Sequence, residues 1–198
     1  MKPISKSLRN ALTPLLAAAC LAPSIAAAGV TIYYEGRAVD AAAVKTVIQT
    51  VRDEARRHGW RVLDASHAEI TLERVVGYDM KTYRGPVEGV SVFPALNCEP
   101  LHFQFDTDGF MQDQVKTQFA SPAIHIAITE LLRKIAPHLT RFEVDDEGEY
   151  WDTGDARKLQ DQIDTINARL AAMKRARRDL KGPVTMPDGR IVDLMGRD

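Results

Sequence analysis

Two periods of hydrophobic and polar residues follow one another along the chain. A spacing of three and four between apolar residues predicts amphipathic helices in three segments: between Asp40 and Gly59, between Ser121 and Pro137, and over residues 156–182. The first two segments follow residues typical of a helix N-cap. The third segment carries a narrow apolar seam in steps of four and three, as in a helix that packs along one edge.

Short β-branched and aromatic runs predict the strands, over residues 30–34, 60–63, 69–76, 89–93, 101–105 and 141–144. Residues 77–86 show little periodicity, and we expect them to form a loop. After the last strand, Asp146-Glu147-Gly148 is expected to turn the chain into a hairpin that returns through Tyr150 and Trp151.

This order of elements predicts an α+β fold. We expect a mainly antiparallel or mixed sheet with two helices on one face, followed by a long C-terminal amphipathic helix. The expected divisions are a signal peptide over residues 1–28, an α+β domain over 29–155, the C-terminal helix over 156–182, and a tail over 183–198 that contains a turn.

The first 28 residues have the order of a secretory signal: three basic residues, an apolar stretch, and small residues before Gly29. We therefore expect a cleaved, exported protein that is periplasmic or secreted. In a rival interpretation, Cys20 is the lipid-acceptor cysteine of a bacterial lipoprotein, although the residues after it are too apolar for a polar tether. No segment has the roughly 18 apolar residues of a transmembrane helix.

Charge and cysteine content narrow the function classes. Of the 26 basic residues, three lie before Gly29, whereas all 27 acidic residues lie after it, so the remainder has a net charge of about −4. A nucleic-acid binder would normally carry a basic surplus, and we expect no nucleic-acid partner. Cys98 is the only cysteine after residue 28, so no intrachain disulfide is expected there.

Seven acidic residues without an intervening Lys or Arg form the densest feature, at positions 143, 145, 146, 147, 149, 152 and 155. Asp145, Asp146 and Glu149 are candidate ligands for Ca²⁺ or another divalent cation, because such ions prefer oxygen ligands. The spacing matches no EF-hand loop. A solvated acidic hairpin without a cofactor is the preferred interpretation, and a docking surface for a basic partner is the alternative.

Cys98, His102 and His125 are the only combination that resembles a thiolate or zinc site. They are candidate catalytic residues, but no local signature joins them. An ordinary buried cysteine and structural histidines explain the same residues. The sequence contains no hydrolase nucleophile elbow, phosphate loop or dinucleotide-binding loop.

The candidate partner-binding residues combine large aromatic side chains with part of the acidic run: Tyr78, Tyr83, Asp145, Asp146, Glu147, Glu149 and Trp151. Exposed aromatic residues often anchor protein interfaces, although more of them cover the edge of a core. The apolar seam of the C-terminal helix suits either the domain's own surface or a second copy of the chain.

These observations favour a non-enzymatic, exported protein that binds another protein of the bacterial envelope. The alternative is a metal-assisted envelope hydrolase built from the clustered carboxylates and a histidine. A third hypothesis is a sensor of a small ligand that dimerises through its C-terminal helix. No sequence motif identifies a substrate.

Overall fold

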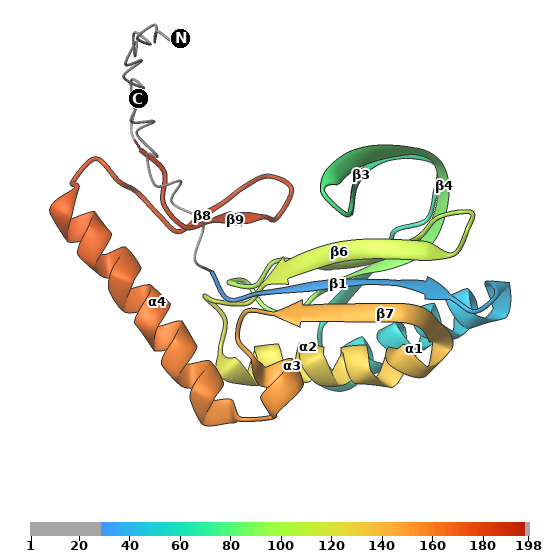
Figure 1. The fold of residues 1–198 in the computed structure, drawn as a ribbon, viewed down its shortest axis with the longest axis horizontal. Coiled ribbons are helices and arrows are strands. Elements are labelled where there is room, and N and C mark those ends of the chain that lie inside the picture. Colours follow the sequence, from blue (N-terminus) through green and yellow to red (C-terminus); the bar gives the residue numbers. More distant parts are fainter. Residues whose placement is uncertain (1–28, 197–198) are drawn as a thin grey trace, which may run out of the picture.

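The computed structural model describes residues 29–196 (Figure 1). The expected signal peptide, with Cys20, lies outside the described residues. The elements are β1 (Thr31–Ala38), α1 (Ala41–His58), β2 (Arg61–Asp64), β3 (His67–Val76), β4 (Asp79–Phe93), β5 (Leu101–Phe105), β6 (Phe110–Lys116), α2 (Pro122–Ile135), η1 (Ala136–His138), β7 (Leu139–Asp146), α3 (Tyr150–Thr153), α4 (Ala156–Ala176), β8 (Val184–Thr185) and β9 (Ile191–Val192).

Every named strand pair is antiparallel. β1 lies between β6 and β7, and β4 pairs with β2, β3 and β5. A tight turn over residues 106–109 joins β5 to β6. Beyond the turn, side chains take the place of part of the backbone ladder: Asp113 Oδ2 accepts from His102 N at 2.8 Å, and Glu99 Oε2 accepts from Lys116 N at 2.9 Å.

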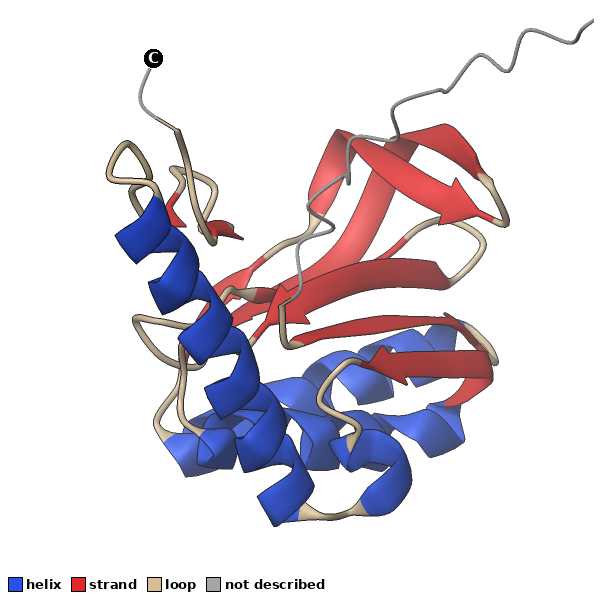
Figure 2. Ribbon diagram, turned by 60° about the vertical axis from the view of Figure 1, so that its left-hand side comes forward, coloured by secondary structure: helices blue, strands red, loops and turns tan. Residues whose placement is uncertain are grey.

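The strands form two larger sheets, β6–β1–β7 and β2–β4–β3 with β5 paired to β4, and the main core lies between these sheets and the helices α1 and α2 (Figures 1 and 2). Alternate residues of β1 and β5 point into it, and the apolar stripes of both helices face them. Asp40 caps α1 by accepting a hydrogen bond from Ala43 N at 2.7 Å. The largest fully buried apolar and aromatic side chains are Tyr34, Phe103, Phe105, Ile32, Leu101, Met111, Ile128, Leu131, Leu132, Ile135 and Leu159.

Helix α4 contributes a second, smaller core. Leu159, Ile163 and Ile166 are buried against Val30 at the start of β1, with Ile126 packed beside them. Leu170 packs against the same cluster, so the α4 seam packs on the chain's own domain from Leu159 to Leu170. The helix ends at Ala176, six residues before the end that the sequence predicts.

Two hairpins lie over the sheet face that the helices leave open. β3 and β4 form a long hairpin that curls over this face, and the β8–β9 hairpin lies over it from the other side (Figures 1 and 2). None of the helices in residues 29–196 is long and apolar enough to cross a membrane.

The structure confirms a mixed α+β fold with antiparallel sheets and corrects three local predictions. Residues 77–86 do not form a loop, because the chain turns at Gly77 (φ 64°) and continues as strand β4 from Asp79. Much of this part of β4 is exposed on both faces, so its sequence does not alternate.

The hairpin expected through Tyr150 and Trp151 is also wrong, because those residues begin the short helix α3 after a turn. Strand β6, over residues 110–116, was not among the predicted strands.

Candidate functional site

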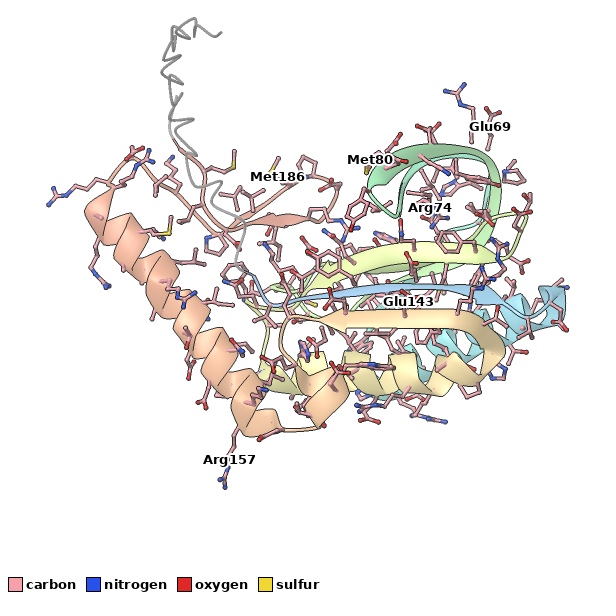
Figure 3. The ribbon with its side chains drawn as sticks, viewed as in Figure 1. Glu69, Arg74, Met80, Glu143, Arg157 and Met186 are labelled. Atoms are coloured by element: carbon pink, nitrogen blue, oxygen red, sulfur yellow. The ribbon has the colours of Figure 1, made fainter. Side chains whose placement is uncertain are left out.

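The open face of β7, β1 and β6 gathers acidic side chains. Tyr33 is in register with Asp145 of β7 and with Gln114 of β6, and Glu35 is in register with Glu143 and Gln112. Residues in register share a face, and the alternate residues Ile32 and Tyr34 are buried in the core. The two rows therefore lie on the open face, where Figure 3 shows Glu143.

Four carboxylates of this face, Glu35, Glu143, Asp145 and Glu147, form no ion pair among the described residues. Glu35 accepts from the Gln112 amide and Glu147 from Thr31 N. Partial burial, together with the charge of Asp145, raises the pKa of Glu147, although hydrogen bonds and Lys116 oppose the rise. Burial and the charge of Glu147 likewise raise the pKa of Tyr33. The face therefore holds excess negative charge.

The tips of the two hairpins flank this acidic face with exposed apolar side chains. The β3–β4 tip exposes Val75, Val76, Tyr78 and Met80, and Tyr78 is fully exposed. Met186, in the turn of the β8–β9 hairpin, is also exposed. Figure 3 shows Met80 and Met186 at the ends of the two hairpins that face one another.

Hydrogen bonds to β5 and β6 hold the β3–β4 hairpin in place. The buried Arg74 donates to Gln112 O at 3.2 Å and to Gln104 O at 3.5 Å, and its guanidinium lies over the Phe110 ring. The Gln112 amide pairs with both backbone groups of Val75, at 2.7 and 2.8 Å. The side chain thus satisfies a strand edge as a neighbouring strand would.

Buried charge pairs hold the β8–β9 hairpin on the other side. Arg190 donates to Asp113 Oδ1 at 2.5 Å, to Gln114 O at 2.6 Å and to Glu99 Oε2 at 3.2 Å. Lys116 Nζ pairs with Asp193 Oδ1 at 3.1 Å. On β6, the contacts of the β3–β4 hairpin are at Gln112, and those of the β8–β9 hairpin extend from Asp113 to Lys116.

The three candidate catalytic residues lie in separate environments. Burial, with a smaller contribution from Glu99, raises the pKa of the Cys98 thiol to about 12, so the thiol is protonated at neutral pH. His102 Nδ1 hydrogen-bonds to Ser91 Oγ at 2.6 Å, and burial lowers the pKa of this histidine. The structure does not join either residue to His125 by a hydrogen bond.

His125 lies in a fully buried network with Thr117 and Asp146. Its Nδ1 is 2.8 Å from Thr117 Oγ1, and its Nε2 is 3.1 Å from Asp146 Oδ2. The order of hydroxyl, imidazole and carboxylate resembles a catalytic relay, but the imidazole has no exposed surface. A substrate cannot reach it in this conformation, and its hydrogen bonds join α2 to the ends of β6 and β7.

The candidate metal ligands do not converge. Asp146 is buried and accepts from Gly148 N at 2.7 Å and Trp151 N at 2.8 Å as well as from His125, whereas Asp145 lies on the open face. Glu149 pairs with Lys158 and accepts from the Gln162 amide. Within residues 29–196 there is no group of three His, Cys, Asp or Glu side chains placed to hold a metal ion.

The candidate aromatic anchors also separate. Tyr78 is at the exposed hairpin tip, whereas the Tyr83 hydroxyl donates to Pro86 O at 2.6 Å on the same strand. Trp151 packs edge-on against Phe142 and beneath Arg133, which donates to its carbonyl. Of the candidate partner-binding residues, the open face thus contains Asp145 and Glu147, with Tyr78 at its border.

Sequence reasoning missed Tyr33, Glu35 and Met186. The alternation of Ile32 and Tyr34 with Tyr33 and Glu35 was a usable signal, because it assigns the two sets to opposite faces. No sequence pattern indicates that the hairpin with Met186 lies over the same face. Comparison with known proteins finds no matching family model, no similar curated protein and no similar solved structure.

Proposed function

We propose that this chain is an exported, non-enzymatic binding protein of the bacterial envelope, which binds a basic, partly apolar segment of another envelope protein. The supporting observation is the acidic open face between two hairpins whose tips expose apolar side chains (Figure 3). Export to the periplasm or beyond rests on the pattern of residues 1–28, with lipidation of Cys20 as the disfavoured alternative.

The dimensions of the face suit an extended segment. Gln114, Tyr33 and Asp145 form a row across β6, β1 and β7. Neighbouring strands are spaced by about 4.8 Å, so the row extends over about 10 Å across the three strands. One extended stretch of polypeptide therefore fits along the row, with its basic side chains near the carboxylates.

The apolar tips provide the second part of the interaction. Methionine is flexible and polarizable, so Met80 and Met186 can adapt to apolar side chains of different shapes. Tyr33, which is 41% exposed, offers a large ring on the floor of the face. The carboxylates would speed encounter with a basic segment, and the apolar contacts would slow its release.

The charges favour a protein partner over a lipid surface. At the β3–β4 tip, Glu73 and Asp79 balance Lys81 and Arg84. A hairpin that inserts into an anionic membrane would benefit from a basic surplus around its apolar residues. The acidic face beside the tip would be repelled by anionic lipid headgroups.

Fluorescence anisotropy with two labelled peptides tests the proposal. One peptide alternates lysine or arginine with leucine or methionine, and in the other glutamate replaces every basic residue. We expect only the basic peptide to bind, with a micromolar dissociation constant. Its affinity should fall as the salt concentration increases from roughly 0.05 to 0.5 M, because salt screens the charge pairs. The double variant Glu143→Lys/Asp145→Lys should weaken this binding at least tenfold.

The matched control is Asp161→Lys/Asp164→Lys, which makes the same charge change on the exposed surface of α4. It should leave the affinity within about twofold, since Asp161 and Asp164 lie on α4 and are not part of the strands that form the open face. If both double variants lost the same affinity, the effect would depend on net charge alone, which would contradict a specific site. Equal binding of the acidic peptide would contradict the proposal as well.

A further inference from the structure

A cavity of about 600 Å³ lies at one end of the sheet, apart from the rows that define the acidic open face. The connection between β1 and α1, the β5–β6 turn and residues 86–88 of β4 surround it. This volume is within the range of roughly 300 to 1,000 Å³ that is usual for small-molecule sites.

The inner wall of the cavity is apolar. Val44 of α1, Val87 of β4 and Phe105 of β5 line it, and each is at least nine-tenths buried. Because these side chains also belong to well-packed elements, the wall keeps its shape without a ligand. It would accommodate the apolar body of a ligand and remove that body from water.

The rim is charged and mainly acidic. Asp40, Glu88, Asp106 and Asp108 line it, with Arg37 as the one basic residue among the lining side chains. Asp106 Oδ1 accepts from Asp108 N and Phe110 N, and Asp40 Oδ1 accepts from Ala43 N. Each of these two carboxylates is thus fixed by one oxygen, and the other oxygen has no hydrogen bond among the described residues.

Two electrostatic effects oppose each other at this rim. The N-terminus of α1 contributes about half a positive charge, which on its own would favour an anion. The side chains contribute a formal charge of −3 when four carboxylates are set against Arg37. Arg37 donates to the carbonyl of Asp108 and lies 4.0 Å from its Oδ2, whereas Asp40, Glu88 and Asp106 form no ion pair among the described residues, so the rim keeps a net negative charge.

We propose that this cavity binds a small organic cation: a primary amine attached to an apolar chain. The apolar wall receives the chain, and the ammonium group lies at the rim, near the free oxygens of Asp40 and Asp106 and the exposed Glu88 and Asp108. The site is distinct from the open face and does not depend on the proposed protein partner.

Amide chemical shifts of the ¹⁵N-labelled protein, titrated with n-hexylamine, n-hexanol and hexanoate at pH 7, test this proposal. The three probes have similar apolar chains and differ in charge. We expect hexylamine to shift the amides of Ala41, Val87, Glu88, Asp108 and Gly109 in a saturable manner at millimolar concentration. Hexanol should act at least fivefold more weakly, and hexanoate should produce no saturable shift.

Two variants locate the effect. Glu88→Gln/Asp108→Asn removes two exposed charges and should weaken hexylamine binding at least fivefold, whereas Ala41→Phe should occlude the cavity to all three probes. Glu69→Gln, an exposed acidic residue of β3 outside the lining, is the matched control and should bind as the parent does. Thermal melts establish that each variant is folded.

Equal responses to hexylamine and hexanol would overturn the cationic specificity. Chemical-shift changes scattered outside the lining would overturn the site itself. So would a titration that does not saturate by about 20 mM hexylamine, a concentration sufficient for a weak ligand of this size. Binding of the basic peptide should be unchanged in Glu88→Gln/Asp108→Asn, so the two proposals fail or succeed separately.

Discussion

At the residue scale, Asp146 is a buried carboxylate that accepts hydrogen bonds from three different segments of the chain. Its carboxylate accepts from His125 Nε2, Gly148 N and Trp151 N, and it joins α2, the end of β7 and α3. In Asp146→Asn, an amide group faces N–H donors. We expect a loss of roughly 3 to 5 kcal/mol in the free energy of unfolding, as for other broken buried pairs. Urea denaturation followed by circular dichroism measures this loss.

The neighbouring Asp145→Asn is the control, because this exposed substitution should cost less than about 0.5 kcal/mol. Burial acts to raise the pKa of Asp146, but the hydrogen bonds with His125, Trp151 and Gly148 and the interaction with His125 prevail and lower it. The carboxylate therefore stabilises the fold above its unfolded pKa of about 3.9, and this stability is lost as the pH falls through the lower folded value. At acidic pH, the free energy of unfolding should therefore fall more steeply in the parent protein than in Asp146→Asn. Equal slopes in the two proteins would contradict this assignment.

At the scale of elements, the sequence predicted the helices better than the strands. Asp40 caps α1 as its position indicates, whereas Ser121 precedes α2 without a side-chain cap hydrogen bond. Strand β6 escaped prediction because Asp113 stands between Met111 and Val115, at a position where an apolar residue is expected. Its carboxylate fills the interval between β5 and β6 and meets Arg190, 77 residues away, a pairing that no local pattern reveals.

That pairing predicts the behaviour of the β8–β9 hairpin. In Arg190→Met, the nearly buried Glu99 and Asp113 lose their cation, and we expect a loss of about 3 kcal/mol. Hydrogen exchange of the Lys181 and Met195 amides, which pair with each other's carbonyls, should quicken more than that of α1. Arg177→Met, which removes an exposed ion pair with Asp179, is the control. Unchanged exchange at both amides would show that Arg190 does not hold the hairpin.

At the scale of the whole molecule, the candidate site combines segments that are far apart in sequence. The acidic run was evident, but strand alternation sends Asp145 to the open face and Asp146 into the core. The site also needs β1, more than 100 residues earlier, and hairpin tips around residues 78 and 186. The sequence therefore predicted the part of the site that lies on β7, and the fold determines which other elements lie beside it.

The position of α4 also bears on self-association. Leu159, Ile163 and Ile166 of its seam are buried on the chain's own domain, and Leu170 packs against the same cluster, which leaves the partly buried Met173 toward the far end. A stable dimer buries about 1,200 to 2,000 Å² in total, far more than one such side chain provides. We expect light scattering on residues 29–198 at about 10 μM to give a monomer mass, because the affinity from so small a contact would be weaker than that. A doubled mass that Met173→Glu returns to the monomer would instead establish the helix as a dimer interface.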